Sequence, residues 1–291
     1  MEPGRGSITA ERVAERRAAH QVLDNPKVFD DPLALAILRP EVARQLRENA
    51  RREKGSPLSG YMRAFVSMRS RFAEDALRRA YGRGVRQYVI VGAGFDTFAY
   101  RNPYPDLPVF EIDHPDTQAV KRSRLEAARI DIPGTLTFVT VDLTRAPFVE
   151  GLASAGFDAR APAFVAWLGV SMYLSPDDVR ATLRAIGRLA IGTGLVLDYA
   201  VPPSSLSWVE RMFYGVLLRR VARIGEPWKT FLTSGALAAE LTEAGLEVEE
   251  DLGPLEINQR YFANRSDGLK VSSAGRIASA RVVRTVESVS V

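Results

Sequence analysis

The chain has 291 residues, 46% hydrophobic and 25% charged, as in an ordinary globular protein. It has no cysteine and two histidines, which excludes disulfides, thiolate catalysis and cysteine- or histidine-rich metal sites, so we expect no bound metal. Its 39 basic and 35 acidic residues give a net charge of +4, too small an excess to predict a nucleic-acid partner. No apolar run reaches the ~18 residues of a membrane span and no signal peptide is evident. We therefore expect a cytoplasmic protein without a membrane partner.

Residues 1–84 carry helical patterns and are predicted to form an N-terminal helical cap. Thr9 can cap a first helix that runs to about residue 23, before the break at Asn25-Pro26. Asp30-Asp31-Pro32 predicts a short second helix over residues 33–38. Two more helices are expected over residues 40–54 and 58–81, on either side of a break at Gly55-Ser56-Pro57.

From residue 85 the pattern changes to strands that alternate with helices. Strands are predicted at 87–91, 109–113, 136–142, 163–168, 194–200, 246–250 and 277–284, and helices at 115–130, 176–190 and 234–244, the last capped by Ser234. Such alternation predicts an α/β domain over residues 85–291, with a mostly parallel sheet covered on both faces by helices. Ligands bind these sheets beyond the carboxyl ends of the strands.

An extra segment, about residues 202–233, follows the fifth strand. Its apolar residues fall on one helical face and are Trp208, Met212, Phe213, Val216 and Leu217. Two interpretations stay open. The helix packs against the edge of the sheet, or it forms a lid whose apolar face covers a bound substrate.

Three strand ends carry residue types that suit a nucleoside. The first strand runs into Gly92-Ala93-Gly94, a turn that lets the backbone approach a ligand closely. The second ends at Asp113, whose carboxylate can accept both hydroxyl protons of a ribose. The third ends at Asp142-Leu143, an acceptor for an adenine amino group beside an apolar contact for the ring. Together they predict an enzyme with a nucleoside cofactor.

Thr97 distinguishes two kinds of cofactor. A dinucleotide site has a glycine at this position, for close packing under a pyrophosphate. S-adenosylmethionine has no phosphate, so its site tolerates Thr97. This favours S-adenosylmethionine and leaves an NAD(P)-dependent oxidoreductase as the alternative. Structural explanations also stay open for Asp113, as the N-cap of the next helix, and for Asp142, as a turn carboxylate.

Several longer motifs point to one family. They include Phe29-Asp30-Asp31-Pro32-Leu33-Ala34, Met68-Arg69-Ser70-Arg71-Phe72, Val91-Gly92-Ala93-Gly94-Phe95-Asp96-Thr97, Glu111-Ile112-Asp113-His114-Pro115, Gly169-Val170-Ser171-Met172-Tyr173-Leu174 and Tyr261-Phe262-Ala263-Asn264-Arg265. With these motifs, nearly the whole chain resembles the leucine carboxyl methyltransferase-like family of class I S-adenosylmethionine-dependent methyltransferases, which includes bacterial polyketide O-methyltransferases. The resemblance implies a Rossmann-like sheet with an antiparallel last strand, a helical cap and a helical lid insertion.

The resemblance also implies cofactor contacts at matching positions. They are Arg69, helped by Arg17, for the methionine carboxylate, Gly92, Ala93 and Gly94 for the methionine and ribose, Asp113 and His114 on the ribose side, and Asp142 and Leu143 for the adenine. One position departs from the family, which usually has a glutamate where this chain has Leu168. Because Leu168 cannot accept a hydrogen bond, backbone carbonyls or water are expected to serve the cofactor's ammonium group.

Methyl transfer depends mainly on positioning the acceptor in line with the methyl group. A general base is needed only when the acceptor is protonated near neutral pH. Tyr173, after the fourth strand, and His20, on the first helix, are the candidates to meet the acceptor, and each also has a packing explanation. Further candidates are His114, Asp198 and Tyr199.

We therefore expect an O-methyltransferase that acts on a carboxylate or hydroxyl of a small, largely apolar acceptor, possible examples being polyketide-type products. A catalytically silent cofactor-binding relative is an alternative, for which Leu168 is the only indication. A nucleic-acid methyltransferase is disfavoured, because Leu168-Gly169-Val170-Ser171 stands where base-modifying enzymes often have an Asn/Asp-Pro-Pro-aromatic stretch. The sequence leaves the identity of the acceptor and the oligomeric state open.

Overall fold

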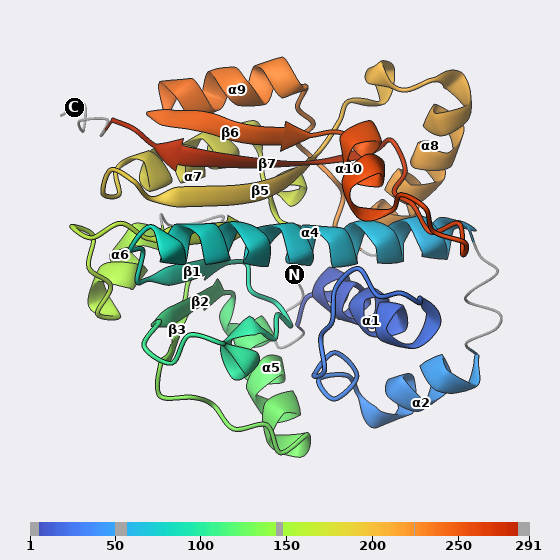
Figure 1. The fold of residues 1–291 in the computed structure, drawn as a ribbon, viewed down its shortest axis with the longest axis horizontal. Coiled ribbons are helices and arrows are strands. Elements are labelled where there is room, and N and C mark those ends of the chain that lie inside the picture. Colours follow the sequence, from blue (N-terminus) through green and yellow to red (C-terminus); the bar gives the residue numbers. More distant parts are fainter. Residues whose placement is uncertain (1–5, 50–56, 144–147, 224, 285–291) are drawn as a thin grey trace.

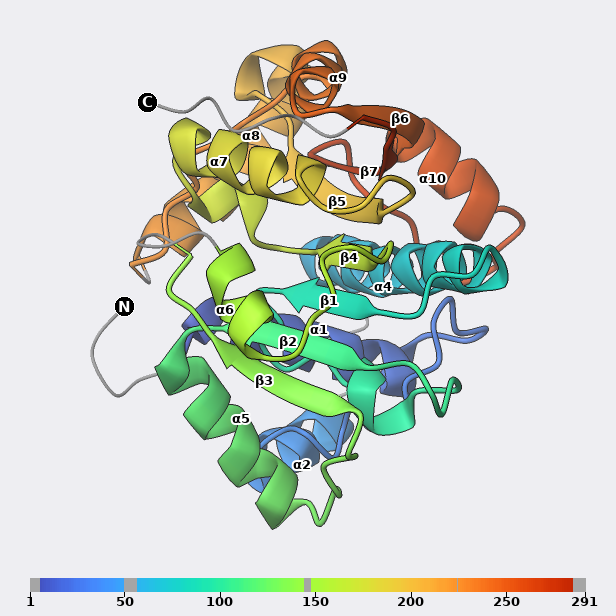
Figure 2. The same ribbon diagram turned by 90° about the vertical axis from the view of Figure 1, so that its left-hand side faces the viewer.

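The computed structural model of the chain describes residues 6–49, 57–143, 148–223 and 225–284. Its centre is a seven-stranded sheet in the order β3-β2-β1-β4-β5-β7-β6 (Figures 1 and 2). β1 to β5 run parallel, and β7 is antiparallel to both β5 and β6. The expected mostly parallel sheet with an antiparallel last strand is confirmed. The strands are β1 (Tyr88–Val91), β2 (Val109–Asp113), β3 (Leu136–Thr140), β4 (Phe164–Trp167), β5 (Gly194–Ala200), β6 (Leu246–Leu252) and β7 (Gly275–Val282).

Helices cover both faces of the sheet, which explains why the central strands are continuously apolar. In β1, Val89 and Val91 belong to one core cluster, and Tyr88 and Ile90 belong to the other. The first cluster includes residues of α6 (Phe148–Ser154), α7 (Pro176–Gly187) and α9 (Ser234–Glu243), and the second includes residues of α4 (Pro57–Gly82) and α10 (Pro254–Tyr261).

The N-terminal helices lie over one end of this sheet. Figure 1 shows α4 running along the sheet, with α1 (Ile8–Leu23) and α2 (Pro40–Glu48) beside it. Small residues of α1 pack with Leu125 of α5 (Pro115–Ala127) and with Phe95 from the turn after β1. Because Met68 and Phe72 of α4 are fully part of the sheet's own core, α4 joins the cap to the sheet.

Several helix boundaries differ from the sequence-based expectations. Ser7, not Thr9, caps α1, since its hydroxyl accepts the N–H of Ala10 at 3.1 Å. Residues 33–38 form turns rather than a helix. α2 ends at Glu48, and the rest of the helix expected to residue 54, with the break at residues 55–56, lies outside the described residues. Thr233, rather than the expected Ser234, caps α9.

Two of the short helices, α6 and α10, were not expected, and the third strand is shorter than expected. β3 ends at Thr140, so Asp142 and Leu143 lie in the loop that follows it. This loop still leaves the sheet at its carboxyl edge, which is the edge predicted for the site.

The segment after β5 holds a short 3₁₀ turn (Pro203–Ser205) and the helix α8 (Trp208–Arg223). α8 packs through Tyr214 and Val221, whereas Trp208, Met212 and Phe213 are 73%, 63% and 69% exposed. Most of the expected apolar face therefore points to solvent rather than onto the sheet, although Leu217 packs inward, and the lid role stays a prediction. Among the described residues, no helix has the length and apolar character needed to cross a membrane.

Candidate functional site

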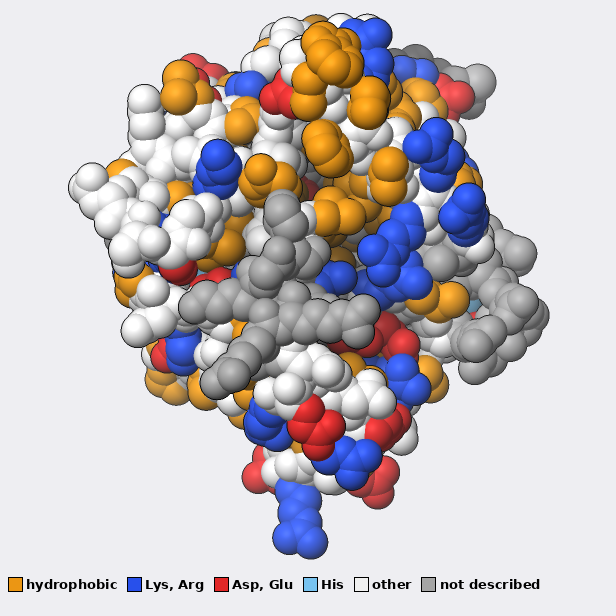
Figure 3. Space-filling model, turned by 90° about the vertical axis from the view of Figure 1, so that its right-hand side faces the viewer, with side chains coloured by type: hydrophobic (Ala, Val, Ile, Leu, Met, Phe, Trp, Pro, Cys, Tyr) orange, Lys and Arg blue, Asp and Glu red, His pale blue; other side chains and the backbone are white. Residues whose placement is uncertain are grey.

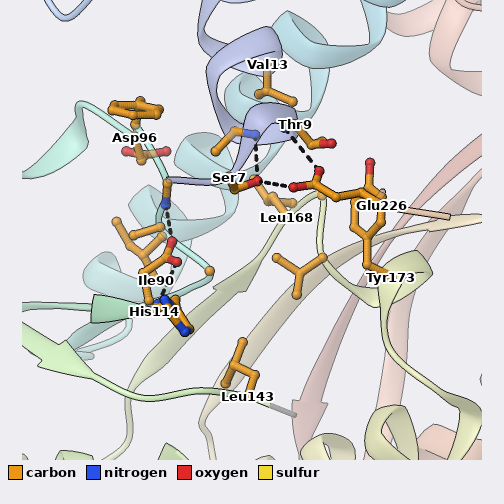
Figure 4. A pocket seen from close by; sticks show the side chains of 18 of the residues that line it. Ser7, Thr9, Val13, Ile90, Asp96, His114, Leu143, Leu168, Tyr173 and Glu226 are labelled. Carbon is orange, nitrogen blue, oxygen red and sulfur yellow. Dashed lines mark hydrogen bonds between the residues drawn. The ribbon is translucent and has the colours of Figure 1, made fainter. Parts of the chain in front are cut away.

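A cavity of about 920 Å³ lies at the carboxyl edge of β1, β2 and β4. Other parts of its wall come from the start of α1 and from Gly225, Glu226, Pro227 and Lys229, which follow α8. Figure 4 shows His114 and Leu143 toward one end, and Tyr173 and Glu226 toward the other. Nearly all of the predicted site residues line this cavity. These are Arg17, Arg69, Gly92, Ala93, Gly94, Asp113, His114, Asp142, Leu143, Leu168 and Tyr173.

The glycine turn is held against β2 by its backbone. The N–H groups of Gly92 and Ala93 both donate to the carbonyl of Ile112, at 2.8 and 3.0 Å. Gly92 has a φ of 69°, and a Cβ added there would lie 2.3 Å from Cγ2 of Val170. Only glycine therefore fits this position, and the turn leaves its backbone exposed to the cavity.

Asp113 accepts two backbone hydrogen bonds at the end of β2. The N–H of Gly94 donates to Oδ2 at 2.6 Å, and the N–H of His114 donates to Oδ1 at 2.7 Å. Burial raises the pKa of Asp113, and these two N–H groups partly offset that effect. Each carboxylate oxygen can still accept a second hydrogen bond, as a ribose would require. His114, not Asp113, caps α5, because its ring accepts the N–H of Asp116 at 3.3 Å.

Arg69, on α4, is held in place by an acidic residue of β5. Its Nη1 donates to Oδ2 of Asp198 at 2.9 Å, and Asp198 is fully buried on β5. The N–H of Gly169 donates to the other oxygen of Asp198. Gly169 has a φ of 73°, and a Cβ there would lie 2.7 Å from Nη2 of Arg69. The guanidinium is thus packed on the loop that begins just after Leu168, while Asp198 does not line the cavity.

Arg17 links the cap to the glycine turn. Its Nη2 donates to the carbonyl of Phe95, and its Nε lies 2.8 Å from Oδ2 of Asp31. The hydroxyl of Thr97 donates to the same oxygen of Asp31, at 2.7 Å. Thr97, which replaces the third glycine of a dinucleotide motif, therefore holds the cap in place.

The structure places His20 outside the cavity, so its expected role as a base is corrected. The side chain is fully buried, and its Nδ1 lies 2.9 Å from Oδ2 of Asp24. Its Nε2 accepts the N–H of Val28 at 3.0 Å. Burial alone would raise the pKa of Asp24, but hydrogen bonds from His20 and Arg63 outweigh it and lower that pKa. With both ring nitrogens occupied inside the cap, His20 has a structural role.

Tyr173 and Glu226 form the end of the cavity opposite Leu143. The ring of Tyr173 packs edge-on against Trp228, with the centroids 6.3 Å apart. Burial raises the pKa of Tyr173. Glu226 accepts hydrogen bonds from the hydroxyl of Ser7 and the N–H of Thr9, both at 3.1 Å (Figure 4). This carboxylate ties the segment after α8 to the N-terminus of α1, where a helix favours negative charge.

Glu226 could not be found from the sequence, because its partners Ser7 and Thr9 lie 219 and 217 residues away along the chain. The Arg69–Asp198 pair is similarly remote, with 129 residues between its members. The spacing of His20 and Asp24, four residues apart on one helix face, was a visible indication of a local pair.

The strand order, the antiparallel β7 and the glycine turn beside two acids define the class I methyltransferase fold. Two solved structures share it. A DUF574 family protein from Streptomyces avermitilis is 16% identical, with a TM-score of 0.58 over 91% of this chain and 99% of that chain. A protein from Thermobifida fusca, provisionally described as a methyltransferase, is 18% identical, with a TM-score of 0.57 over 97% of both chains.

The family model described as leucine carboxyl methyltransferase matches residues 10–187. A Bacillus subtilis relative, YktD, is 30% identical over 92% of this chain and 95% of its own length. A Streptomyces coelicolor relative is 33% identical over 73% of this chain and 80% of its own. Both are provisionally named S-adenosyl-L-methionine-dependent methyltransferases. The chain belongs to the leucine carboxyl methyltransferase family of S-adenosylmethionine-dependent methyltransferases, as its motifs indicated.

Proposed function

We propose that this methyltransferase acts on an oxygen of a small, largely apolar acceptor, and that a carboxylate is its preferred acceptor over a hydroxyl. A polyketide-type acid is one acceptor of this kind. The observation that carries the proposal is the composition of the cavity end around Tyr173. It combines apolar walls, a tyrosine with a raised pKa and a nearby lysine, and it does not include His20.

The donor set fits S-adenosylmethionine, which when bound supplies an electrophilic methyl group on sulfur. Asp113 keeps acceptor capacity for the ribose hydroxyls. Arg69, oriented by Asp198, offers a cation for the methionine carboxylate. Asp142 and Leu143 border the end of the cavity suited to an adenine.

The cavity has room for an acceptor beside the cofactor. Its volume of about 920 Å³ is near the upper end of the range of about 300–1,000 Å³ for small-molecule sites. The wall near Tyr173 includes Val13, Val170 and Leu174, which would exclude water and orient an apolar acceptor. Such positioning supplies most of the rate enhancement in a displacement of this type.

Acid–base considerations favour a carboxylate. Burial raises the pKa of Tyr173, so its phenol stays protonated near neutral pH and can donate a hydrogen bond but cannot remove a proton. The ring of His114 is engaged as a helix cap. A carboxylate is already ionised near neutral pH and needs no base. Lys229 adds a positively charged residue to the lining at this end, where its backbone N–H donates to the carbonyl of Met172 at 2.7 Å.

A transfer assay with methyl-labelled S-adenosylmethionine tests the proposal. Matched apolar acids and their alcohols are offered as acceptors. A methyl ester releases its label as methanol in mild alkali, whereas a methyl ether retains it. We expect alkali-labile label with the acids and little transfer to the alcohols. Alkali-stable label from the alcohols alone would move the assignment to hydroxyls, and bound cofactor without transfer to any acceptor would support a catalytically silent protein.

A further inference from the structure

The exposed side of α8 is an apolar surface that nothing in the described structure covers. Trp208, Val209, Met212, Phe213 and Val216 are all large and exposed, and their spacing of three and four residues puts them on neighbouring turns of one side. Figure 3 shows hydrophobic side chains gathered over the upper part of the face on which α8 lies, with Lys and Arg side chains beside them. Contiguous apolar surface of this kind marks an interaction site.

The same side of the helix becomes basic at its C-terminal end. Arg219, Arg220 and Arg223 are exposed, and they continue the rows of Met212, Phe213 and Val216 by one or two turns. Within the described part of the chain, none of these three arginines has an ion-pair partner. The helix contains four arginines and one glutamate. The glutamate, Glu210, is already hydrogen-bonded to Ser207 and Ser273.

The opposite side of α8 is anchored, so the exposed side is presented in a fixed orientation. Tyr214 is buried with Val201 and Leu206, and its hydroxyl donates to the carbonyl of Val201 at 3.2 Å. Leu217 and Leu218 pack against the same cluster. The exposed apolar residues therefore lie on the outer face of a helix that is packed against the rest of the protein.

The charge pattern favours an anionic lipid surface as the occupant. In a twofold contact centred on α8, the arginines of one copy would face the same helix of the other, in which basic residues exceed acidic ones four to one. A bilayer with anionic headgroups supplies apolar depth for Trp208, Met212 and Phe213 and negative charge for the arginines. Helices with aromatic and aliphatic residues on one part of their surface and basic residues on another bind in this way.

We propose that the exposed face of α8 binds the surface of an anionic membrane, with the helix lying parallel to it. This departs from the sequence-based expectation of no membrane partner, and it requires no helix that crosses the bilayer. Gly225, Glu226, Pro227 and Lys229, which come soon after α8 in the chain, line the cavity, so docking brings the cavity wall close to the lipid surface. The proposal does not depend on which acceptor the enzyme methylates.

Vesicle co-flotation of the full chain is the test, with vesicles of phosphatidylcholine alone or with phosphatidylglycerol added. We expect binding to the anionic vesicles, a blue shift of Trp208 fluorescence, and loss of binding at high salt. Phe213→Glu should weaken binding at least tenfold. Arg220→Ala should weaken it about fivefold, which corresponds to about 1 kcal/mol per basic residue at a lipid surface. Ile191→Glu is the matched control, since Ile191 is 61% exposed and lies outside α8.

Circular dichroism and S-adenosylhomocysteine binding show whether each variant is folded, because α8 itself does not line the cavity. The proposal is overturned if anionic vesicles do not bind the wild-type chain, or if Phe213→Glu and Ile191→Glu behave alike. A concentration-dependent dimer that Phe213→Glu abolishes, without vesicle binding, would instead assign this face to contact between copies.

Discussion

Replacing Asp113 by alanine probes the ribose end of the cavity. Its carboxylate lies at the end of β2 and accepts the N–H groups of Gly94 and His114 at 2.6 and 2.7 Å. A hydrogen bond to a charged group contributes about 1.5–3 kcal/mol, and 1.4 kcal/mol is a factor of ten in affinity. Loss of one ribose bond should therefore weaken S-adenosylhomocysteine binding at least about tenfold, and loss of two about a hundredfold or more. Isothermal titration calorimetry measures the dissociation constants of S-adenosylhomocysteine for the wild type and for Asp113→Ala.

Two companion variants make this result interpretable. Asp113→Asn keeps one carbonyl oxygen and should give an intermediate loss. Asp106→Ala removes an exposed acid before the start of β2, at the opposite edge of the sheet, and should leave binding unchanged. If Asp113→Ala is folded by circular dichroism and binds as tightly as the wild type, the ribose does not lie against this carboxylate and the reasoning is refuted.

Three further predictions concern residues that line the cavity or hold its lining in place. Asp198→Asn should lower the free energy of unfolding by about 3–5 kcal/mol, because Arg69 keeps a buried charge without its acid; a loss below about 1 kcal/mol in urea titration would contradict this. Because burial raises the pKa of Tyr173, its phenol should stay neutral up to about pH 9, so Tyr173→Phe should leave the shape of the kcat/KM profile between about pH 7 and 9 unchanged; an alkaline change that the variant abolishes would show a titrating tyrosine. Glu226→Gln should speed S-adenosylhomocysteine release about fivefold, since a neutral amide holds Ser7 more weakly; equal stopped-flow release rates would show that the Glu226–Ser7 contact does not limit release.

The strands were predictable because both faces of the sheet are buried. Successive strand residues such as Val89 and Ile90 face opposite cores, so both must be apolar. The resulting continuous apolar stretches differ clearly from the periodic pattern of the helical segments around them. α6 and α10 were missed because helices of seven and eight residues give too few turns for a periodic pattern. The outward direction of the α8 face was not predictable, since periodicity shows that a face is apolar but does not show what covers it.

Residues that follow a strand directly were placed correctly in the cavity by their position in the chain. Gly92 and Asp113 belong to neighbouring parallel strands, whose carboxyl ends must meet at one edge. Asp198 was named only as a candidate to meet the acceptor. Its pairing with Arg69, and that of Glu226 with Ser7, could not be inferred in this way, because these partners come from helices in remote parts of the chain. His20 was misassigned since a helical position alone does not tell which side of the cap a side chain faces.

Calorimetric titration with S-adenosylhomocysteine tests most directly whether the cavity beside the glycine turn is the cofactor site. We expect one site per chain with a dissociation constant in the micromolar range, a binding free energy of about −8 kcal/mol. We also expect Arg69→Ala to weaken it and NAD to give no heat under the same conditions. If S-adenosylhomocysteine at millimolar concentration produces no heat, or if NAD binds in its place, the central claim is wrong.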